Sequence, residues 1–116
     1  MIIRAETPAD HADIRRINDE AFRDPIDAQL IDMIRASDRF VPELSLVAVS
    51  RGRTLGHVIS SYVDVVPGTS RVLQVGPLAV VPACQRQGIG TALMQETIRI
   101  ADELGEPLLL IEGSPQ

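Results

Sequence analysis

The fold of this chain is decided by the stretch Gln85-Arg86-Gln87-Gly88-Ile89-Gly90-Thr91. The stretch follows an apolar run, Val72–Val81, and precedes an amphipathic segment, Ala92–Leu104. This order predicts a strand, a short glycine-bearing loop and the beginning of a helix. The first turn of a helix has free backbone N–H groups and partial positive charge, and glycines let a ligand approach the main chain closely. The stretch therefore predicts a site for a phosphate or pyrophosphate.

Two other phosphate-binding motifs differ from this stretch. A dinucleotide-binding loop has a third glycine where this sequence has Leu93, although Glu112 ends the next expected strand about where a ribose-binding acid would lie. In that motif the strand also runs directly into the first glycine, whereas residues 82–87 intervene here. A Walker A loop requires a Gly-Lys-Ser/Thr sequence, which is missing. A wider pyrophosphate cradle fits better, and the dinucleotide-binding loop is kept as the weaker alternative.

The whole sequence predicts one α/β (α+β) domain, residues 1–116, with a mixed, mostly antiparallel sheet flanked by helices in the order β-α-α-β-β-β-α-β. Gly76-Pro77 inside a strand predicts a bulge or a splayed edge, because proline donates no ladder hydrogen bond. A helix between the last two strands predicts a parallel pair with a right-handed crossover. Strands are expected over Ile2–Arg4, Leu44–Val49, Leu55–Val66, Val72–Val81 and Leu108–Ile111, and helices over Pro8–Phe22, Ile26–Ala36 and Ala92–Leu104.

These residues carry a resemblance to a known family. Gln85-x-x-Gly88-x-Gly90, after a strand with Gly76-Pro77, resembles the acetyl-CoA motif Q/R-x-x-G-x-G/A of the GNAT N-acetyltransferase superfamily. The resemblance implies an acyl-CoA N-acyltransferase-like fold in which the loop and the helix N-terminus hold the pyrophosphate of coenzyme A. It also implies that the strand pairs with the pantetheine arm and that one of its N–H groups polarises the thioester carbonyl. The implied cofactor-binding residues are Leu78, Ala79, Val80, Gln85, Arg86, Gln87, Gly88, Ile89, Gly90 and Thr91.

The composition of the sequence excludes several classes of protein. With 116 residues, 45% of them apolar and 23% charged, the sequence is typical of one soluble domain. A net charge of -5 argues against nonspecific nucleic-acid binding, which needs a basic surface. The single cysteine allows no internal disulfide. No apolar run reaches membrane-spanning length, and the first residues do not form a signal peptide. A cytoplasmic location is therefore expected. No cluster of His, Cys and carboxylate residues predicts a metal site.

The sequence assigns no catalytic residue firmly. His57 lies among apolar residues of a predicted strand, where a neutral imidazole could deprotonate an ammonium substrate; a core or rim position is the alternative. Asp19 and Glu20 close the first helix, near where related folds bind the acceptor, and are expected to be solvated carboxylates. His11 is expected to be exposed. Cys84 is expected to be a packing residue or a bystander, because no paired His and Asp has a recognisable spacing.

The sequence also departs from the family. Where many members have a strand carboxylate as the base, this sequence has Gln74, so the base is unassigned. The family's general acid is often a tyrosine on a helix after the strand that corresponds to Leu108–Ile111, whereas Tyr62 lies on an earlier strand. We therefore expect a domain truncated after the fifth predicted strand. An apolar edge at Leu108–Ile111 would favour pairing with another chain, which predicts a homodimer.

The expected function is transfer of an acetyl group from acetyl-CoA to a primary amine by direct attack in a ternary complex. The acceptor stays open between a small amine, an aminoglycoside, a polyamine, a peptide N-terminus and a protein lysine. The alternative is a non-catalytic CoA-binding or dimerisation module without turnover. A nucleotide-dependent oxidoreductase is a third and weaker hypothesis, which would require binding of NAD or NADP.

Overall fold

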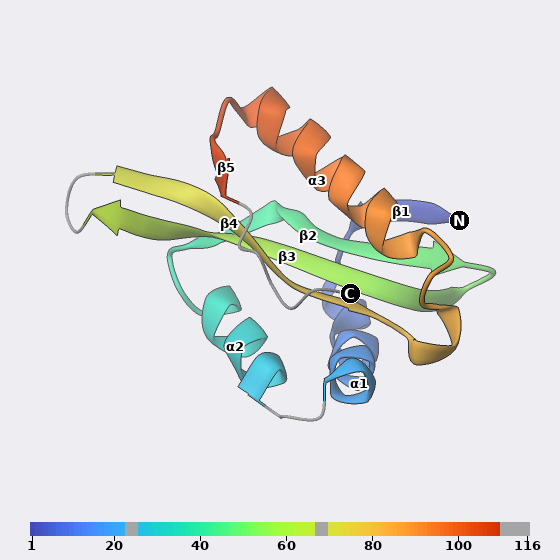
Figure 1. Cartoon of the computed structure of the whole chain (residues 1–116). Coiled ribbons are helices and arrows are strands. Elements are labelled where there is room, and N and C mark those ends of the chain that lie inside the picture. Colours follow the sequence, from blue (N-terminus) through green and yellow to red (C-terminus); the bar gives the residue numbers. More distant parts are fainter. Residues whose placement is uncertain (23–25, 67–69, 110–116) are drawn as a thin grey trace.

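The computed structural model shows one sheet with helices on both of its faces (Figure 1). The structure describes residues 1–22, 26–66 and 70–109. In chain order, its elements are β1 (Ile2–Ala5), the short 3-10 helix η1 (Pro8–Asp10), α1 (His11–Ala21), α2 (Ile26–Arg35), β2 (Phe40–Ser50), β3 (Arg53–Val66), β4 (Ser70–Val80), the short 3-10 helix η2 (Pro82–Cys84), α3 (Ile89–Leu104) and β5 (Leu108–Leu109).

The sheet confirms the expected order of elements. Its strands lie side by side in the order β1-β2-β3-β4-β5, and neighbours are antiparallel except for the parallel pair β4 and β5. Helix α3 is the crossover between that parallel pair, as the sequence predicted. The hairpin between β2 and β3 closes at the pair Ser50 and Arg53, and Arg51 and Gly52 between them have φ of 52° and 75°. Positive φ at both central residues is what a type I′ turn requires.

Several element boundaries differ from the prediction. Strand β2 begins at Phe40 instead of Leu44, and its register with β3 shifts between Phe40 and Ser45, next to Pro42. Helix α3 begins at Ile89 instead of Ala92, because Gly88 adopts a left-handed conformation that serves as the N-cap. The first helix starts as the 3-10 turn η1 before α1. The end of the predicted strand Leu108–Ile111 lies outside the described residues.

Helix α3 covers one face of the sheet (Figure 1). Its Ile89 and Leu93 pack with Leu46 and Ala48 of β2 and Val58 of β3 in a buried apolar cluster. The helix approaches the sheet closely at Gly56, because a Cβ placed there would lie 3.1 Å from Leu93 Cδ1 and 3.1 Å from Ile89 Cγ2. The aliphatic spacing predicted for this helix therefore positions its N-terminal turn directly above β3 and β4.

Helices α1 and α2 cover the opposite face (Figure 1). Ile14 of α1 and Ile31 of α2 pack with Val47 of β2 and Ile59 of β3. These strand residues alternate with those under α3, as expected for a sheet that is buried on both sides. Leu30 of α2 lies outside this cluster and is 43% exposed.

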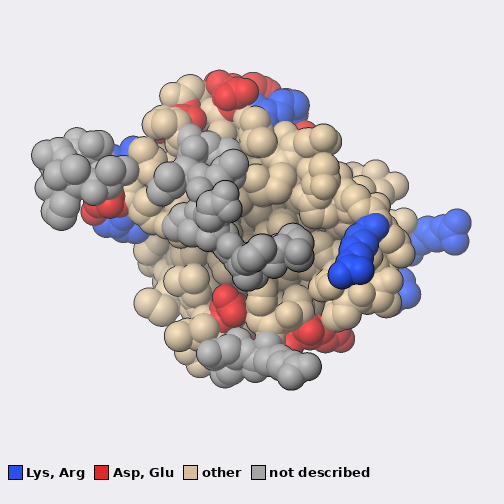
Figure 2. All heavy atoms as spheres, viewed as in Figure 1, with Lys and Arg blue, Asp and Glu red and all other residues tan. Residues whose placement is uncertain are grey.

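Charged side chains are dispersed over the molecule. On the face drawn in Figure 2, arginines lie apart from one another and do not form a single basic patch. All 11 basic residues of the sequence are arginines. Among the described residues, no helix is long and apolar enough to cross a membrane.

Replacement of Leu93 by Ala tests the packing of α3. Because Leu93 is fully buried in the cluster with Val58, Leu93→Ala should lower the free energy of unfolding by about 2–5 kcal/mol in urea denaturation. The matched control is Ile98→Ala on the same helix, where the side chain is 41% exposed and the loss should stay within about 0.5 kcal/mol. Equal losses for the two variants would contradict the assigned faces of α3.

Candidate functional site

Strand β4 carries a bulge at Gly76-Pro77. Opposite Val58 and Ser60 of β3, the paired residues of β4 are Leu78 and Val75, so β4 contains an extra residue at this point. Gly76 has a φ of 120°, a conformation that favours glycine. The expected bulge is confirmed, and it lies just beyond Leu73 and Gln74, which pair with β5.

Beyond the bulge, β4 turns part of its backbone away from β3. The Val81 N–H donates to the Leu55 carbonyl at 2.8 Å, which makes these two residues a hydrogen-bonded pair. In an antiparallel ladder such pairs alternate with pairs whose groups point outward. The register pairs Leu78 with Val58 and Val80 with Gly56, so the N–H and C=O groups of Leu78 and Val80 face away from β3. In the described part of the chain, β5 pairs with β4 only at Leu73 and Gln74, before this edge begins.

The loop after β4 ends at an uncapped helix. The first hydrogen bond inside α3 runs from the Ala92 N–H to the Gly88 carbonyl at 3.0 Å, so the N–H groups of residues 89–91 precede the helical ladder. Among the described residues, no side chain caps this end. Arg86 and Gly88 have φ of 67° and 84°, and the side chain of Arg86 is exposed. This geometry suits an anion.

The loop is joined to β4 at two points. The Gln85 side chain donates from Nε2 to the Val80 carbonyl at 3.1 Å, which fixes the start of the loop to the end of the strand. A Cβ at Gly90 would lie 3.6 Å from Leu78 Cδ2 and 4.0 Å from Val80 Cγ2, so the first turn of α3 rests on these side chains. The structure thus places the outward backbone groups of Leu78 and Val80 next to the N–H groups at the start of α3, whereas the backbone groups of Ala79, which pairs with His57, face β3.

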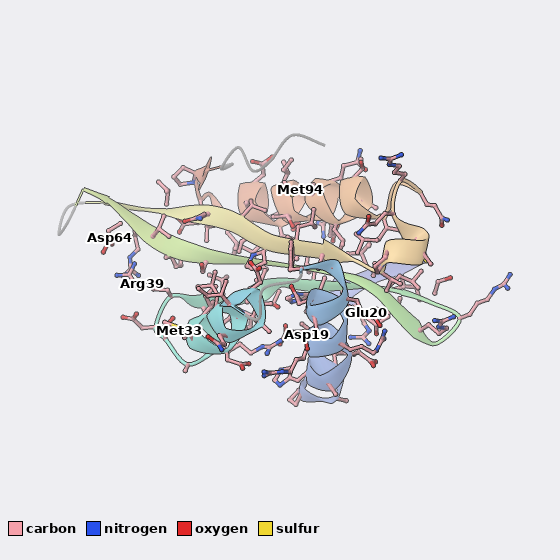
Figure 3. All side chains as sticks on the ribbon, turned by 60° about the horizontal axis from the view of Figure 1, so that its bottom comes forward. Asp19, Glu20, Met33, Arg39, Asp64 and Met94 are labelled. Carbon is pink, nitrogen blue, oxygen red and sulfur yellow. The ribbon has the colours of Figure 1, made fainter. Side chains whose placement is uncertain are left out.

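A pocket of about 290 Å³ opens on the other face of the sheet, beside the bulge. Helix α2 and the residues after it form one wall, and strands β3 and β4 form the floor. In Figure 3, Met33 lies on α2, and Arg39 and Asp64 lie near one another at the same end of the sheet. The lining residues are Leu30, Met33, Ile34, Ser37, Arg39, Ser61, Tyr62, Val63, Gln74 and Gly76.

Comparison with known proteins agrees with this geometry. Residues 11–112 match the model of the acetyltransferase (GNAT) family. The chain belongs to the GNAT family. The crystal structure of a GNAT family acetyltransferase from Brucella melitensis in complex with acetyl-CoA is 31% identical and superimposes with a TM-score of 0.89, covering 97% of this chain and 76% of that one. The GNAT family N-acetyltransferase YhbS from Escherichia coli, in complex with CoA, is 26% identical with a TM-score of 0.84, covering 95% of this chain and 61% of that one.

A curated relative is similar over most of this GNAT chain. It is the uncharacterized N-acetyltransferase YjhQ of Escherichia coli K12, which is 29% identical over 107 residues. The match covers 90% of this chain and 59% of YjhQ, so the chain spans less than two thirds of that relative's length. The family and the fold implied by the resemblance are confirmed.

His57, the candidate base, is a buried member of a polar network in this GNAT domain. Its side chain is inaccessible, and Nε2 lies 3.2 Å from Glu6 Oε1 and 3.0 Å from Ser45 Oγ. The Ser45 hydroxyl donates to Glu6, so Ser45 and Glu6 both lie at the same ring nitrogen of His57. In a serine–histidine–acid triad, by contrast, the serine and the acid contact different ring nitrogens. The structure therefore does not support proton transfer by His57 to or from a substrate.

Glu6 is the centre of this network. Besides Ser45 and His57, its carboxylate accepts hydrogen bonds from Arg35 Nε at 2.9 Å and contacts His11 Nε2 at 2.9 Å. Arg35 is also mostly buried, with a side chain 15% exposed. Burial raises the pKa of Glu6, but hydrogen bonds from His57, Arg35 and Ser45 outweigh it and hold that pKa at about 2. Burial lowers the pKa of His57 despite the contact with Glu6.

The ionised Glu6 fixes the tautomer of His57. A carboxylate can only accept, so the neutral imidazole places its proton on Nε2 and leaves a lone pair on Nδ1. That Nδ1 atom is buried and has no hydrogen-bond partner among the described residues. Because the imidazole ring is inaccessible to solvent, His57 is a structural residue.

The structure gives none of the remaining candidates a catalytic arrangement. Asp19 and Glu20 are exposed on α1, as expected (Figure 3). Cys84 is partly buried against the cluster under α3, in agreement with a packing role. Tyr62 donates to Glu106 Oε1 at 3.0 Å, and burial, followed by this hydrogen bond, raises the pKa of Tyr62. Within residues 1–22, 26–66 and 70–109, no cluster of His, Cys, Asp and Glu could hold a metal ion.

Sequence reasoning missed Glu6 and the pocket wall. Glu6 follows β1 outside any periodic segment, so no spacing pointed to its burial. Met33 gave a weak signal, because it is an apolar residue on the side of α2 opposite to Ile31, and its side chain is 67% exposed.

Removal of the Glu6 charge tests the network. Glu6→Gln should lower the free energy of unfolding at pH 7 by about 3–5 kcal/mol, because Arg35 loses its buried partner. Asp13→Asn is the control: Asp13 is 51% exposed and lies 3.6 Å from Arg16, so its replacement should cost at most about 1 kcal/mol.

The same variants predict a pH dependence. The pKa of Glu6 is lower in the folded chain, about 2, than its ordinary value of 4.5, so its stabilisation is present above pH 4.5 and is lost as pH falls towards 2. Urea denaturation between pH 5 and 2.5 should therefore give a steeper fall for wild type and Asp13→Asn than for Glu6→Gln. Parallel pH profiles for all three proteins would contradict the assignment.

Proposed function

We propose that this chain binds acetyl-CoA and transfers its acetyl group to a primary amine. The observation that carries the proposal is the contact of Gly90 with Leu78 and Val80, which joins an uncapped helix N-terminus to an outward-facing strand edge. Coenzyme A has both matching parts, a pyrophosphate and an amide-bearing pantetheine arm. The Brucella melitensis relative, whose structure contains acetyl-CoA, supports the same ligand.

Each part of the site has a role in this proposal. The N–H groups of residues 89–91 and the mobile charge of Arg86 bind the pyrophosphate. The outward groups of Leu78 and Val80 pair with the pantetheine amides as an added strand would. One outward N–H near Leu78 donates to the thioester carbonyl and stabilises the oxygen as negative charge develops there.

The chemical step needs the amine and the thioester held together. The amine nitrogen attacks the carbonyl carbon, the new C–N bond forms, and the C–S bond breaks with its electron pair going to sulfur. The proton lost from nitrogen balances the proton gained by the CoA thiolate, directly or through water. Orientation in a ternary complex supplies much of the acceleration.

Acetyl-CoA titration with matched variants tests the binding part. Gly88→Asp and Arg86→Glu should each weaken acetyl-CoA binding by about tenfold or more in isothermal titration calorimetry, because each adds a negative charge at the pyrophosphate site. Gly52→Asp and Arg51→Glu are the controls: Gly52 and Arg51 also have positive φ, at 75° and 52°, and lie in the β2–β3 turn. These controls carry the same backbone strain and the same charge changes, so binding should stay near that of wild type.

Thiol release separates the enzyme from the alternative. Free CoA formed from acetyl-CoA in the presence of a primary amine supports transfer. Saturable acetyl-CoA binding without amine-dependent thiol release would instead support a CoA-binding module. No binding of acetyl-CoA by folded protein would overturn both.

We also propose that two copies of the chain associate. Strand β5 is one of the two edge strands in the described part of the sheet, β1 being the other, and edge strands pair readily with another chain. Light scattering at micromolar concentration should give the mass of a dimer, about twice 12.6 kDa. A single species of 12.6 kDa at all concentrations would contradict this proposal.

A further inference from the structure

The pocket between α2 and the sheet differs in character from the cofactor site. It reaches Gly76 at the bulge, so it opens beside the outward edge of β4, where the proposed function places the thioester. Ser61 of β3 and Gln74 of β4 are direct partners in the register and form a polar floor. Leu30 and Met33 of α2 form an apolar rim, with 43% and 67% of their surfaces exposed.

The charges around this pocket are unusual for an amine site. Among the ten lining residues, the only charged one is Arg39, and no carboxylate lines the described walls. Arg39 donates to Asp64 at 2.9 Å and to the Tyr62 carbonyl at 3.4 Å, so the nearest acid at this rim already has a partner. A second ammonium group on the acceptor would therefore lose water without gaining a counter-charge, which is unfavourable.

We infer that the pocket takes a primary amine with an apolar body and no second positive charge. The inference rests on the proposed function and specifies its acceptor. The amine nitrogen lies over the floor, where the oxygens of Ser61 and Gln74 accept its hydrogen bonds, and the apolar body lies against Leu30 and Met33. The volume of about 290 Å³ suits a small acceptor.

Two amines of equal length test the inference directly. Pentylamine and 1,4-diaminobutane differ in having a methyl group or a second amino group at the far end. Each is titrated into the isotope-labelled chain saturated with CoA, and amide signals are followed by NMR. Pentylamine should shift the signals of Ser61 and Gln74 and bind on the order of tenfold more tightly than the diamine. The protein's net charge of -5 attracts the dication, so a preference for pentylamine has to come from the pocket.

Two further variants connect the preference to this pocket. Met33→Glu adds a carboxylate to the exposed rim with little risk to folding and should reduce the preference for pentylamine by about threefold or more. Ile98→Glu makes the same kind of change on α3, where the side chain is 41% exposed, and should leave the preference unchanged. Equal effects of both variants would overturn the assignment to this pocket.

The outcomes also separate this inference from the proposed function. Equal or tighter binding of the diamine, or no binding of either amine, overturns the inference even where acetyl-CoA binds normally. Failure of acetyl-CoA binding in calorimetry overturns the proposed function instead. In that case the two amines are titrated into the chain without CoA, and tighter binding of pentylamine than of the diamine still supports the assigned preference of the pocket.

Discussion

Glu6 is the one buried charge to which most of the α1–α2 face is attached. Its carboxylate meets Ser45 of β2, His57 of β3, His11 of α1 and Arg35 of α2, so elements far apart in the sequence share a single acceptor. An ionised carboxylate removed from water is stable only with such partners. Arg35 lies in the last turn of α2, two positions after Met33. The network therefore fixes the helix that forms one wall of the pocket beside the bulge.

The sheet separates two tasks, and β4 belongs to both. Under α3, the side chains of Leu78 and Val80 support the helix whose N-terminus suits an anion. On the opposite face, Gln74 and Gly76 border the pocket beside α2. The extra residue at the bulge changes the alternation, so that Val75 and Leu78, three positions apart, both pack on the α3 side. In the proposed function, one strand thus serves the cofactor on its edge and the acceptor on its face.

The sequence was most informative where local chemistry decides local structure. Gly88, Gly90 and the apolar spacing after them predicted the cradle and α3, and Gly76-Pro77 predicted the bulge, because these effects act within a few residues. Glu6 and Arg35 could not be paired from the sequence, since 29 positions separate them and the packing of α2 on β2 and β3 brings them together. His57 illustrates the same limit: its apolar face was predicted correctly, but its burial and its partners depend on distant residues.

The bond from Gln85 to the Val80 carbonyl has a consequence for the thermodynamics of ligand capture. It closes a small ring at the start of the loop, while Ile89, 5% exposed, anchors the other end in the core. Between them, Arg86 and Gly88 adopt left-handed conformations. A loop held in this way loses little conformational entropy when a ligand arrives. The attraction between backbone and anion is then available for affinity instead of being consumed in ordering the chain.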